Sequence, residues 1–143
     1  MNSTKTIYER LIGAPDVVAA LDVFDGLPAI FEELAPDDYL AVQEKFCIVI
    51  AAPSSDIDAS TLTDTAREVV QDVRSYARIS GSVADLGDFA RAVRDLFHAR
   101  PDDLTVEGGR CSLVTATGPV AAPTTDPSLV GRRVSLRLLL ERN

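Results

Sequence analysis

The chain has 143 residues, of which 46% are hydrophobic and 25% are charged, a balance typical of one globular domain with a single core rather than of a disordered chain. Its formal net charge of −8 repels phosphate backbones, and the sequence has no basic tract, so broad nucleic-acid binding is disfavoured. The longest apolar run, around residues 46–53, is too short to span a bilayer, and the N-terminus lacks the apolar segment of a secretory signal. We therefore expect a protein that is made in the cytoplasm and has no membrane partner.

The N-terminal region is predicted to form a broken helix, or two short helices, over residues 4–22. Apolar side chains such as Ile7 and Leu11 recur at helical spacing. Gly13 interrupts the pattern, and Pro15 restarts it, because proline is tolerated in a first helical turn. The segment therefore supplies one amphipathic face to the core.

Residues 23–45 are mixed, with a short strand expected around residues 28–31 and a turn or brief helix from Pro36. Two acidic pairs stand here, Glu32 with Glu33 and Asp37 with Asp38. They suggest a metal or acid–base site, but neighbouring residues of a strand point to opposite faces. Solvated loop and helix-start acids are therefore the simpler interpretation.

The middle of the chain predicts a buried strand, an exposed loop and a long second strand. Residues 46–50 form a continuous apolar run, which is typical of a strand buried on both faces. Residues 53–65 are polar and rich in turn formers, so we expect an exposed loop. Residues 69–78 then alternate, and the more buried face is expected to hold Val69, Gln71, Val73, Ser75 and Ala77.

A turn at residues 80–82 and an amphipathic helix follow. Ser82 is a suitable N-cap, with Asp85 as its capping-box partner, and apolar residues recur at steps of three and four up to Phe97. Gly87 suggests a close approach of this helix to the sheet. His98, the one histidine, is interpreted as a helix-end or surface residue, with a catalytic base as the alternative.

The C-terminal part is predicted to contain two strands, at 110–117 and 133–141, separated by a long loop or extended arm at 118–131. The order of elements indicates a single α+β domain over residues 1–143. Its mostly antiparallel sheet of about four to five strands would carry two main helices on one face.

No motif of a known catalytic or nucleotide-binding class occurs, so we expect no enzyme activity, no cofactor and no metal. Cys47 and Cys111 stand in separate apolar runs and are interpreted as buried free thiols. A disulfide or a shared metal is the alternative.

Charge is distributed unevenly along the chain. Residues 1–45 hold nine acidic and three basic residues, whereas residues 128–143 hold four basic residues and one acidic residue. This asymmetry suits head-to-tail contacts between copies, which close into rings when the rotation permits. Alternatively, the charges are solvated or pair within one subunit.

Three stretches resemble the tail terminator (tail completion) proteins of long-tailed bacteriophages. Residues 7–21 are similar to the opening helix of that family and its break. Residues 69–77 and 88–98 are similar to its central strand and the helix that follows, which ends in a Leu-Phe-His sequence here. Residues 124–133 resemble the segment before its last strand.

The resemblance implies a homohexameric ring that caps the last ring of the tail tube, stops its growth and presents a surface to the head. The expected partners are further copies of the chain, the tail tube protein and a head–tail connector protein. DNA would pass through the lumen without specific binding. The expected location is the tail or neck of the virion, after assembly in the host cytoplasm.

The contact residues are expected in the polar segments 53–65 and 118–131 and at the basic end: Asp56, Asp58, Thr124, Asp126, Arg132 and Arg133. Uncommitted surface loops are the alternative for both segments. Two other functions remain open. One is a different neck or head–tail joining protein, and the other is a small cytosolic enzyme or ligand-binding domain with a well-formed apolar pocket.

Overall fold

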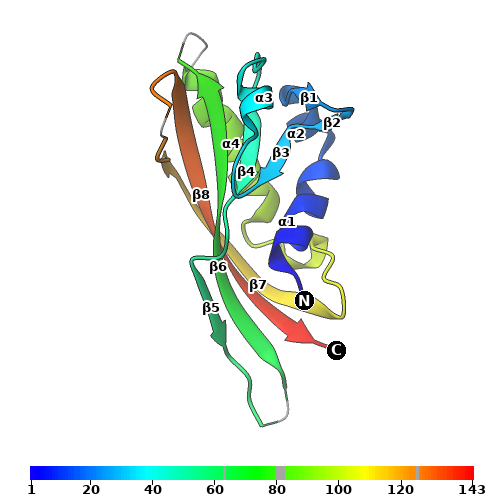
Figure 1. The fold of residues 1–143 in the computed structure, drawn as a ribbon. Helices are drawn as coiled ribbons and strands as arrows, with labels where there is room; N and C mark the ends of the chain where they lie inside the picture. Colours follow the sequence, from blue (N-terminus) through cyan, green and yellow to red (C-terminus); the bar gives the residue numbers. More distant parts are fainter. Residues whose placement is uncertain (63, 80–82, 125) are drawn as a thin grey trace.

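The computed structural model describes residues 1–62, 64–79, 83–124 and 126–143 and has an α+β fold (Figure 1). Three helices lie on one face of a sheet: α1 (Ser3–Ile12), α2 (Pro15–Ala20) and α4 (Val83–Phe97). The sheet is formed by β3 (Ile30–Glu32), β4 (Cys47–Ile50), β5 (Ser55–Asp58), β6 (Ala66–Arg78), β7 (Gly109–Ala121) and β8 (Leu129–Arg142). The predicted fold class is confirmed, although the described residues give six strands in this sheet rather than four or five. None of the described helices is long and apolar enough to cross a lipid bilayer.

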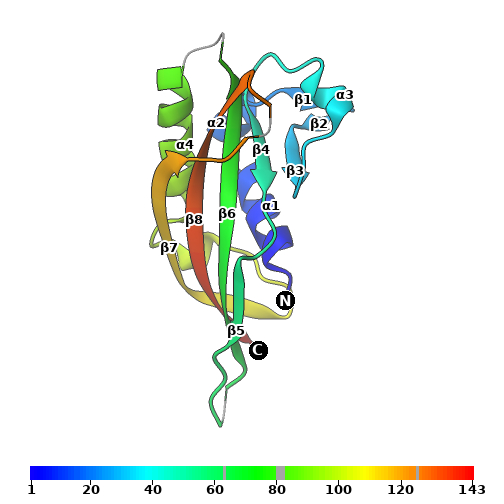
Figure 2. The same ribbon diagram turned by 60° about the vertical axis from the view of Figure 1, so that its left-hand side comes forward.

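The strand order is β3-β4-β6-β8-β7, and β3 and β4 are parallel while the other neighbours are antiparallel. β8 pairs with the whole length of β6 along one edge. The other edge of β6 is shared by β4, opposite residues 73–76, and β5, opposite residues 67–70 (Figure 2). β6 is therefore hydrogen-bonded on both sides along most of its length.

β6 shows the predicted alternation in full. All five residues of the expected inner face, Val69, Gln71, Val73, Ser75 and Ala77, are buried. Apolar residues of β8 at every second position join them, and α1, α2 and α4 cover this layer. The sheet and the helices thus share one main core.

The N-terminal helices form where the pattern predicts a broken helix. Asn2 accepts a hydrogen bond from the Lys5 backbone N–H at 3.1 Å and caps α1. α1 ends before Gly13, and α2 begins at Pro15. Ile7 and Leu11 are fully buried in the main core, so the predicted apolar face is confirmed.

Residues 21–45 form a small unit at the other face of the sheet. β1 (Val23–Phe24) and β2 (Leu27–Pro28) pair through a two-residue turn, in which Asp25 and Gly26 both have positive φ. Asp-Gly is the usual sequence for such a turn. The short helix α3 (Asp37–Leu40) follows β3, as the Pro36 signal predicts.

Gln71 lies at the point where β4 ends and β5 has not yet begun. Its side chain is fully buried, and its Nε2 donates to the Ala51 carbonyl at 2.8 Å and to Thr4 Oγ1 at 2.7 Å. Its Oε1 accepts from Ser3 Oγ at 2.7 Å. The amide thereby links β6 to the start of α1 and supplies a donor to a carbonyl in the gap between two strands.

Two predicted loops are partly wrong. The 53–65 segment contains β5, and β7 and β8 occupy half of 118–131, leaving residues 122–128 as the connection. β7 continues past Pro119 because it is an edge strand, where the missing N–H of proline costs no ladder bond, and a register shift between Thr117 and Val120 accommodates it.

α4 has the predicted apolar face, with Leu86, Phe89 and Val93 buried in the main core. The expected close approach at Gly87 is wrong, because the only atoms within 4 Å of a Cβ added there belong to the side chain of Arg91. The predicted turn at 80–82 and the Ser82 cap lie outside the described residues. His98 is exposed just after the helix, and its Nδ1 accepts from the Ala116 N–H at 3.1 Å, which agrees with a helix-end surface residue.

Replacing Gln71 by Leu is expected to destabilise the fold by about 1–3 kcal/mol, because the Ala51 carbonyl and the Ser3 hydroxyl would lose their partner in a buried site. Urea unfolding followed by circular dichroism measures this loss. Ser112→Ala, at an exposed position of β7, is the control and should stay within about 0.5 kcal/mol of the parent chain. Equal unfolding midpoints for the Gln71→Leu variant and the control would contradict the role of the amide.

Candidate interaction surface

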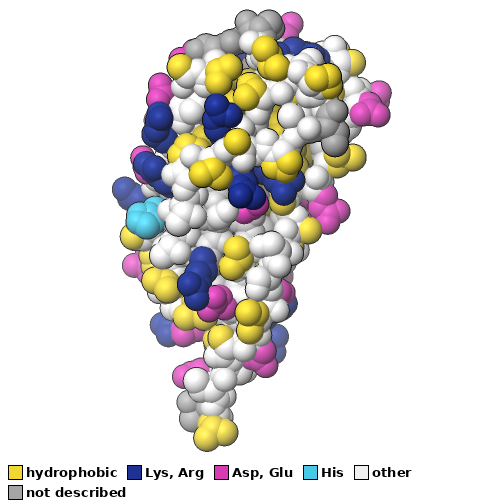
Figure 3. Space-filling model, turned by 90° about the vertical axis from the view of Figure 1, so that its left-hand side faces the viewer, with side chains coloured by type: hydrophobic (Ala, Val, Ile, Leu, Met, Phe, Trp, Pro, Cys, Tyr) yellow, Lys and Arg dark blue, Asp and Glu magenta, His cyan; other side chains and the backbone are white. Residues whose placement is uncertain are grey.

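Figure 2 shows the face of the sheet opposite the helices, which the connection between β7 and β8 crosses in its upper part, while the unit formed by residues 21–45 packs at the β3–β4 edge of this face. A second, smaller core lies between them, formed by Ala29, Ala35, Tyr39, Cys47 and Val49. Figure 3 shows this open face with apolar and basic side chains gathered in its upper half. The candidate surface is the place where these groups meet.

Asp22 holds the 21–45 unit together. Its carboxylate accepts from Tyr39 Oη at 2.6 Å and from the backbone N–H groups of Glu44 and Lys45 at 3.2 and 3.0 Å. Tyr39 also packs against Phe24 and Phe31, with ring centroids 5.5 and 5.0 Å away. Burial, followed by the hydrogen bond to Asp22, raises the pKa of Tyr39 well above its usual value, so the hydroxyl stays a donor.

A groove of about 260 Å³ opens between this unit and the 122–128 connection. Leu34 and Leu40 lie on one side, Pro123 lies on the other, and Arg74 and Tyr76 of β6 form part of the lining. Leu34 is 78% exposed and therefore stands at the rim. We call this hollow the upper groove.

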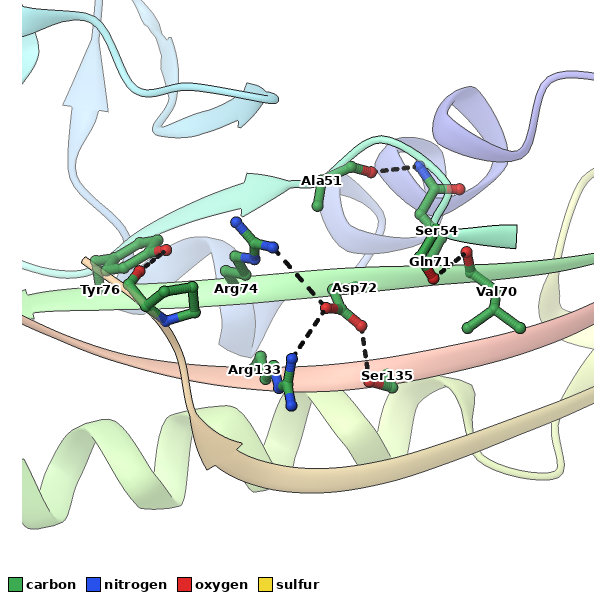
Figure 4. A network of polar contacts seen from close by, with 10 residues as sticks. Ala51, Ser54, Val70, Gln71, Asp72, Arg74, Tyr76, Arg133 and Ser135 are labelled. Atoms are coloured by element: carbon green, nitrogen blue, oxygen red, sulfur yellow. Dashed lines mark hydrogen bonds and ion pairs between the residues drawn. The ribbon is translucent and has the colours of Figure 1, made fainter. Parts of the chain in front are cut away.

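Tyr76 fixes the 122–128 side of the upper groove. Its ring lies over Gly131, where an added Cβ would come within 2.6 Å of a ring carbon, so glycine is needed at this position. Its hydroxyl donates to the Pro123 carbonyl at 3.0 Å (Figure 4). The connection is thereby tied to the sheet that it crosses.

Arg74 brings charge to the upper groove. Asp72 lies below it and accepts from Ser135 Oγ at 2.7 Å, while the guanidinium groups of Arg74 and Arg133 stand 4.0 and 3.8 Å from the same carboxylate (Figure 4). The Nε of Arg74 is buried without a hydrogen-bond partner. The Asp72 carboxylate is thus the shared ionic partner of Arg74 and Arg133, and the Arg74 Nε donor is left without an acceptor.

Thr124, Asp126 and Arg133, three of the six predicted contact residues, lie at or near the upper groove, whereas Arg132 pairs with the inward-facing Ser75 and therefore lies on the other face of β8. Thr124 and Asp126 line it. Asp126 accepts from the Ser128 N–H and hydroxyl, which lowers the pKa of its carboxyl group. Arg133 faces Arg74 across the β6–β8 pair, and the neighbouring Arg132 donates to the Gly131 carbonyl.

The other two predicted contact residues lie at the far end of β6. Asp56 and Asp58 belong to β5, which pairs with residues 67–70 to form a hairpin that projects beyond the rest of the sheet (Figures 1 and 2). Asp56 forms an ion pair with Arg67. Asp58 accepts from the Ser60 N–H at 2.8 Å, and its interactions with Ser60 lower its pKa. The six residues therefore do not form one site.

Some of the residues that create the charge asymmetry form ion pairs or hydrogen bonds within the subunit. Arg137 pairs with Glu68 at 2.7 Å, Arg133 approaches Asp72, and Asp22 is occupied by Tyr39 and backbone donors. The sequence-based alternative of internal pairing thus holds for these residues.

The acidic pairs do not form a metal site. Glu32 lies in β3, whereas Glu33 follows it with a positive φ of 64°. Within the described ranges, no group of three or more histidine, cysteine, aspartate or glutamate side chains is arranged to hold a metal ion. The two cysteines are buried free thiols, as predicted.

Sequence reasoning missed Leu34, Arg74 and Tyr76 as surface residues with a shared role. In the sequence, Arg74 and Tyr76 occupy outer positions of an alternating strand, and Leu34 is one apolar residue in a mixed segment. The three meet only because the 21–45 unit folds over β4 and β6. No local signal in the sequence indicates this contact.

Neither a protein-family model nor a curated protein matches the sequence. A solved structure does match, described as "Virion of native gene transfer agent (GTA) particle". The chain shares its fold with this virion chain. The TM-score is 0.74, and the match covers 96% of this chain and 92% of the other at 18% sequence identity. Similarity therefore extends over nearly the whole of both chains and is a similarity of fold.

Cys47 is expected to be unreactive in the folded protein. Burial is the main cause that raises its pKa to about 12, so little thiolate exists at pH 8 and the sulfur is not accessible. The test is the rate of modification by a colorimetric disulfide reagent at pH 8 in a Cys111→Ala variant, which keeps Cys47 as the single thiol. Reaction should require denaturant, and a rapid reaction under native conditions would show that the thiol is exposed.

Proposed function

We propose that this chain is a structural subunit of a phage-like virion. The observation that carries the proposal is the fold shared along almost the full length of both chains with a chain of the gene transfer agent virion. The described part of the surface offers apolar and charged areas for contact, and the titratable residues singled out from the sequence do not converge on a reacting position. A contact function fits this surface better than a chemical one.

We further propose that the subunit is a tail terminator. In this proposal copies of the chain form a ring, as a homohexamer, on the last ring of the tail tube. The ring stops tube growth and presents its opposite surface to a head–tail connector protein, while DNA passes through the lumen without specific binding. The resemblance of residues 7–21, 69–98 and 124–133 to that family supports this finer assignment, and the acidic net charge of −8 suits a channel through which DNA must slide.

Negative-stain microscopy of the purified protein, alone and mixed with isolated tail tubes, tests the assignment. Six-fold rings or caps on tube ends are the expected result. Binding to portal-filled heads, with no binding to tube ends, would instead identify another neck protein. Binding to neither would contradict a role at the head–tail joint.

The 122–128 connection is expected to contact the tube or the connector. Changing Pro123, Thr124 and Asp126 together to Gly should leave the fold intact, because these exposed or half-buried side chains lie outside the main core. It should reduce capping of tube ends at least several-fold in a count of capped tubes by microscopy. The control changes Asp102, Thr105 and Glu107 to Gly in another surface loop. Equal capping by the two triple variants would contradict the assignment.

Reversing Arg132 and Arg133 to Glu is expected to weaken self-association. Arg133 is 44% exposed and its neutralisation by Asp72 is shared with Arg74, so it retains charge for a neighbouring subunit. Light scattering gives the average mass, which should fall toward that of one chain. Changing the exposed Arg91 and Arg100 of another face to Glu is the control, and a mass equally reduced by both pairs would indicate a general charge effect.

A further inference from the structure

β7 stands at the end of the strand order, so one of its edges is paired with β8 and the other faces away from the sheet. The backbone N–H and C=O groups of such an edge can pair with a further strand. Proteins commonly prevent this pairing with charged side chains or proline in the edge strand. Residues 113–117 of β7 contain neither, so this stretch depends on another element for protection.

The end of α4 lies beside the outer edge of β7 and forms hydrogen bonds with its backbone (Figure 2). The N–H of Ala99, just after the helix, donates to the Val114 carbonyl at 3.0 Å. The N–H of Ala116 donates to Nδ1 of His98 at 3.1 Å. A donor and an acceptor of the outer edge are thus both occupied by the same helix end.

Arg94 extends this contact along β7. Its Nη1 donates to the Gly118 carbonyl at 3.0 Å. The contacted residues of β7 are therefore 114, 116 and 118, which stand at every second position. This is the spacing expected of residues whose backbone groups point away from the paired strand. The end of α4 consequently follows the outer edge of β7 over residues 114–118.

The backbone at Ala99 supports a specific contact. Ala99 has a positive φ of 57°, a conformation that residues with a Cβ seldom adopt. The N–H of His98 still bonds within the helix, to the Arg94 carbonyl at 2.9 Å, whereas the next N–H leaves the helix for β7. An uncommon conformation of this kind persists where the surrounding structure holds it in place.

The strand that an uncovered β7 would bind is β7 of a second copy. Two identical strands can pair antiparallel about a two-fold axis, because each then offers the same N–H and C=O groups to the other. Residues 113–117 carry no charge that would repel their counterpart, and the valine and threonines among them favour strands.

We propose that the end of α4 is a cover that keeps β7 of one copy from pairing with β7 of another. Arg94, His98 and Ala99 make the hydrogen bonds that a neighbouring strand would otherwise make. The cover thereby restricts contacts between copies to other surfaces. This inference goes beyond the proposed function, because it concerns an edge at which copies are kept apart.

The test removes the side-chain part of the cover. The double variant Arg94→Ala/His98→Ala lacks the guanidinium and imidazole groups, and neither side chain belongs to the main core. Adding Thr117→Lys, at an exposed position of β7, gives a triple variant in which pairing is opposed again, because a lysine on an edge strand disfavours strand addition.

Arg91→Ala/Arg100→Ala is the matched control. These guanidinium groups also stand on or just after α4, but they pair with Asp88 and Asp103. Circular dichroism and urea unfolding establish that each variant is folded. Sedimentation velocity over a range of concentrations then gives the mass of the species that each forms.

The double variant should form species larger than those of the parent chain, in a proportion that rises with concentration. The control and the triple variant should keep the mass of the parent chain. Hydrogen–deuterium exchange of the Ala116 amide locates the contact. In the dilute double variant this amide should exchange about tenfold faster than in the parent chain, and it should be protected again in the larger species.

The proposal would be overturned by a folded double variant that keeps the mass of the parent chain at every concentration. Larger species that persist with Thr117→Lys, or in which the Ala116 amide still exchanges rapidly, would also overturn it. If the double variant does not fold, His98→Ala alone is held to the same two measurements. The tail terminator assignment is judged separately by capping of tube ends with the parent chain, which neither result changes.

Discussion

The pairing of β6 with β8 is the constraint on which the rest of the structure depends. All thirteen residues of β6 have a partner in β8, and the two strands together place a row of buried side chains under α1, α2 and α4. Because side chains of a strand alternate, the same pairing sends Asp72, Arg74 and Tyr76 to the opposite face. The main core and the candidate surface therefore lie on opposite faces of the β6–β8 strand pair.

The second edge of β6 gives the molecule its shape. β4 and β5 share this edge with a gap between them, and Gln71 fills the gap with a buried amide that binds Ala51, Ser3 and Thr4. The gap lets the chain leave the packed sheet and return as a projecting hairpin. A buried polar side chain is costly unless it is fully satisfied, and here every polar atom of the Gln71 amide finds a partner.

This arrangement suits a protein that acts through contact. The hairpin and the upper groove stand toward opposite ends of a strand that is held on both sides, so their separation is fixed. A fixed separation between two contact surfaces is what a repeating assembly requires, since each contact then sets the position of the next copy.

The sequence by itself determined the α+β class, the buried face of β6, the break between α1 and α2, and the free thiols, because each depends on local periodicity or on a single residue type. It could not indicate that β7 continues through Pro119 or that β5 interrupts a polar loop, since both depend on which edge of the sheet the segment occupies. The existence of the upper groove could be seen only in the tertiary structure. Leu34, Arg74 and Pro123 are far apart in the chain, and the 21–45 unit and the 122–128 connection bring them together over the open face of the sheet.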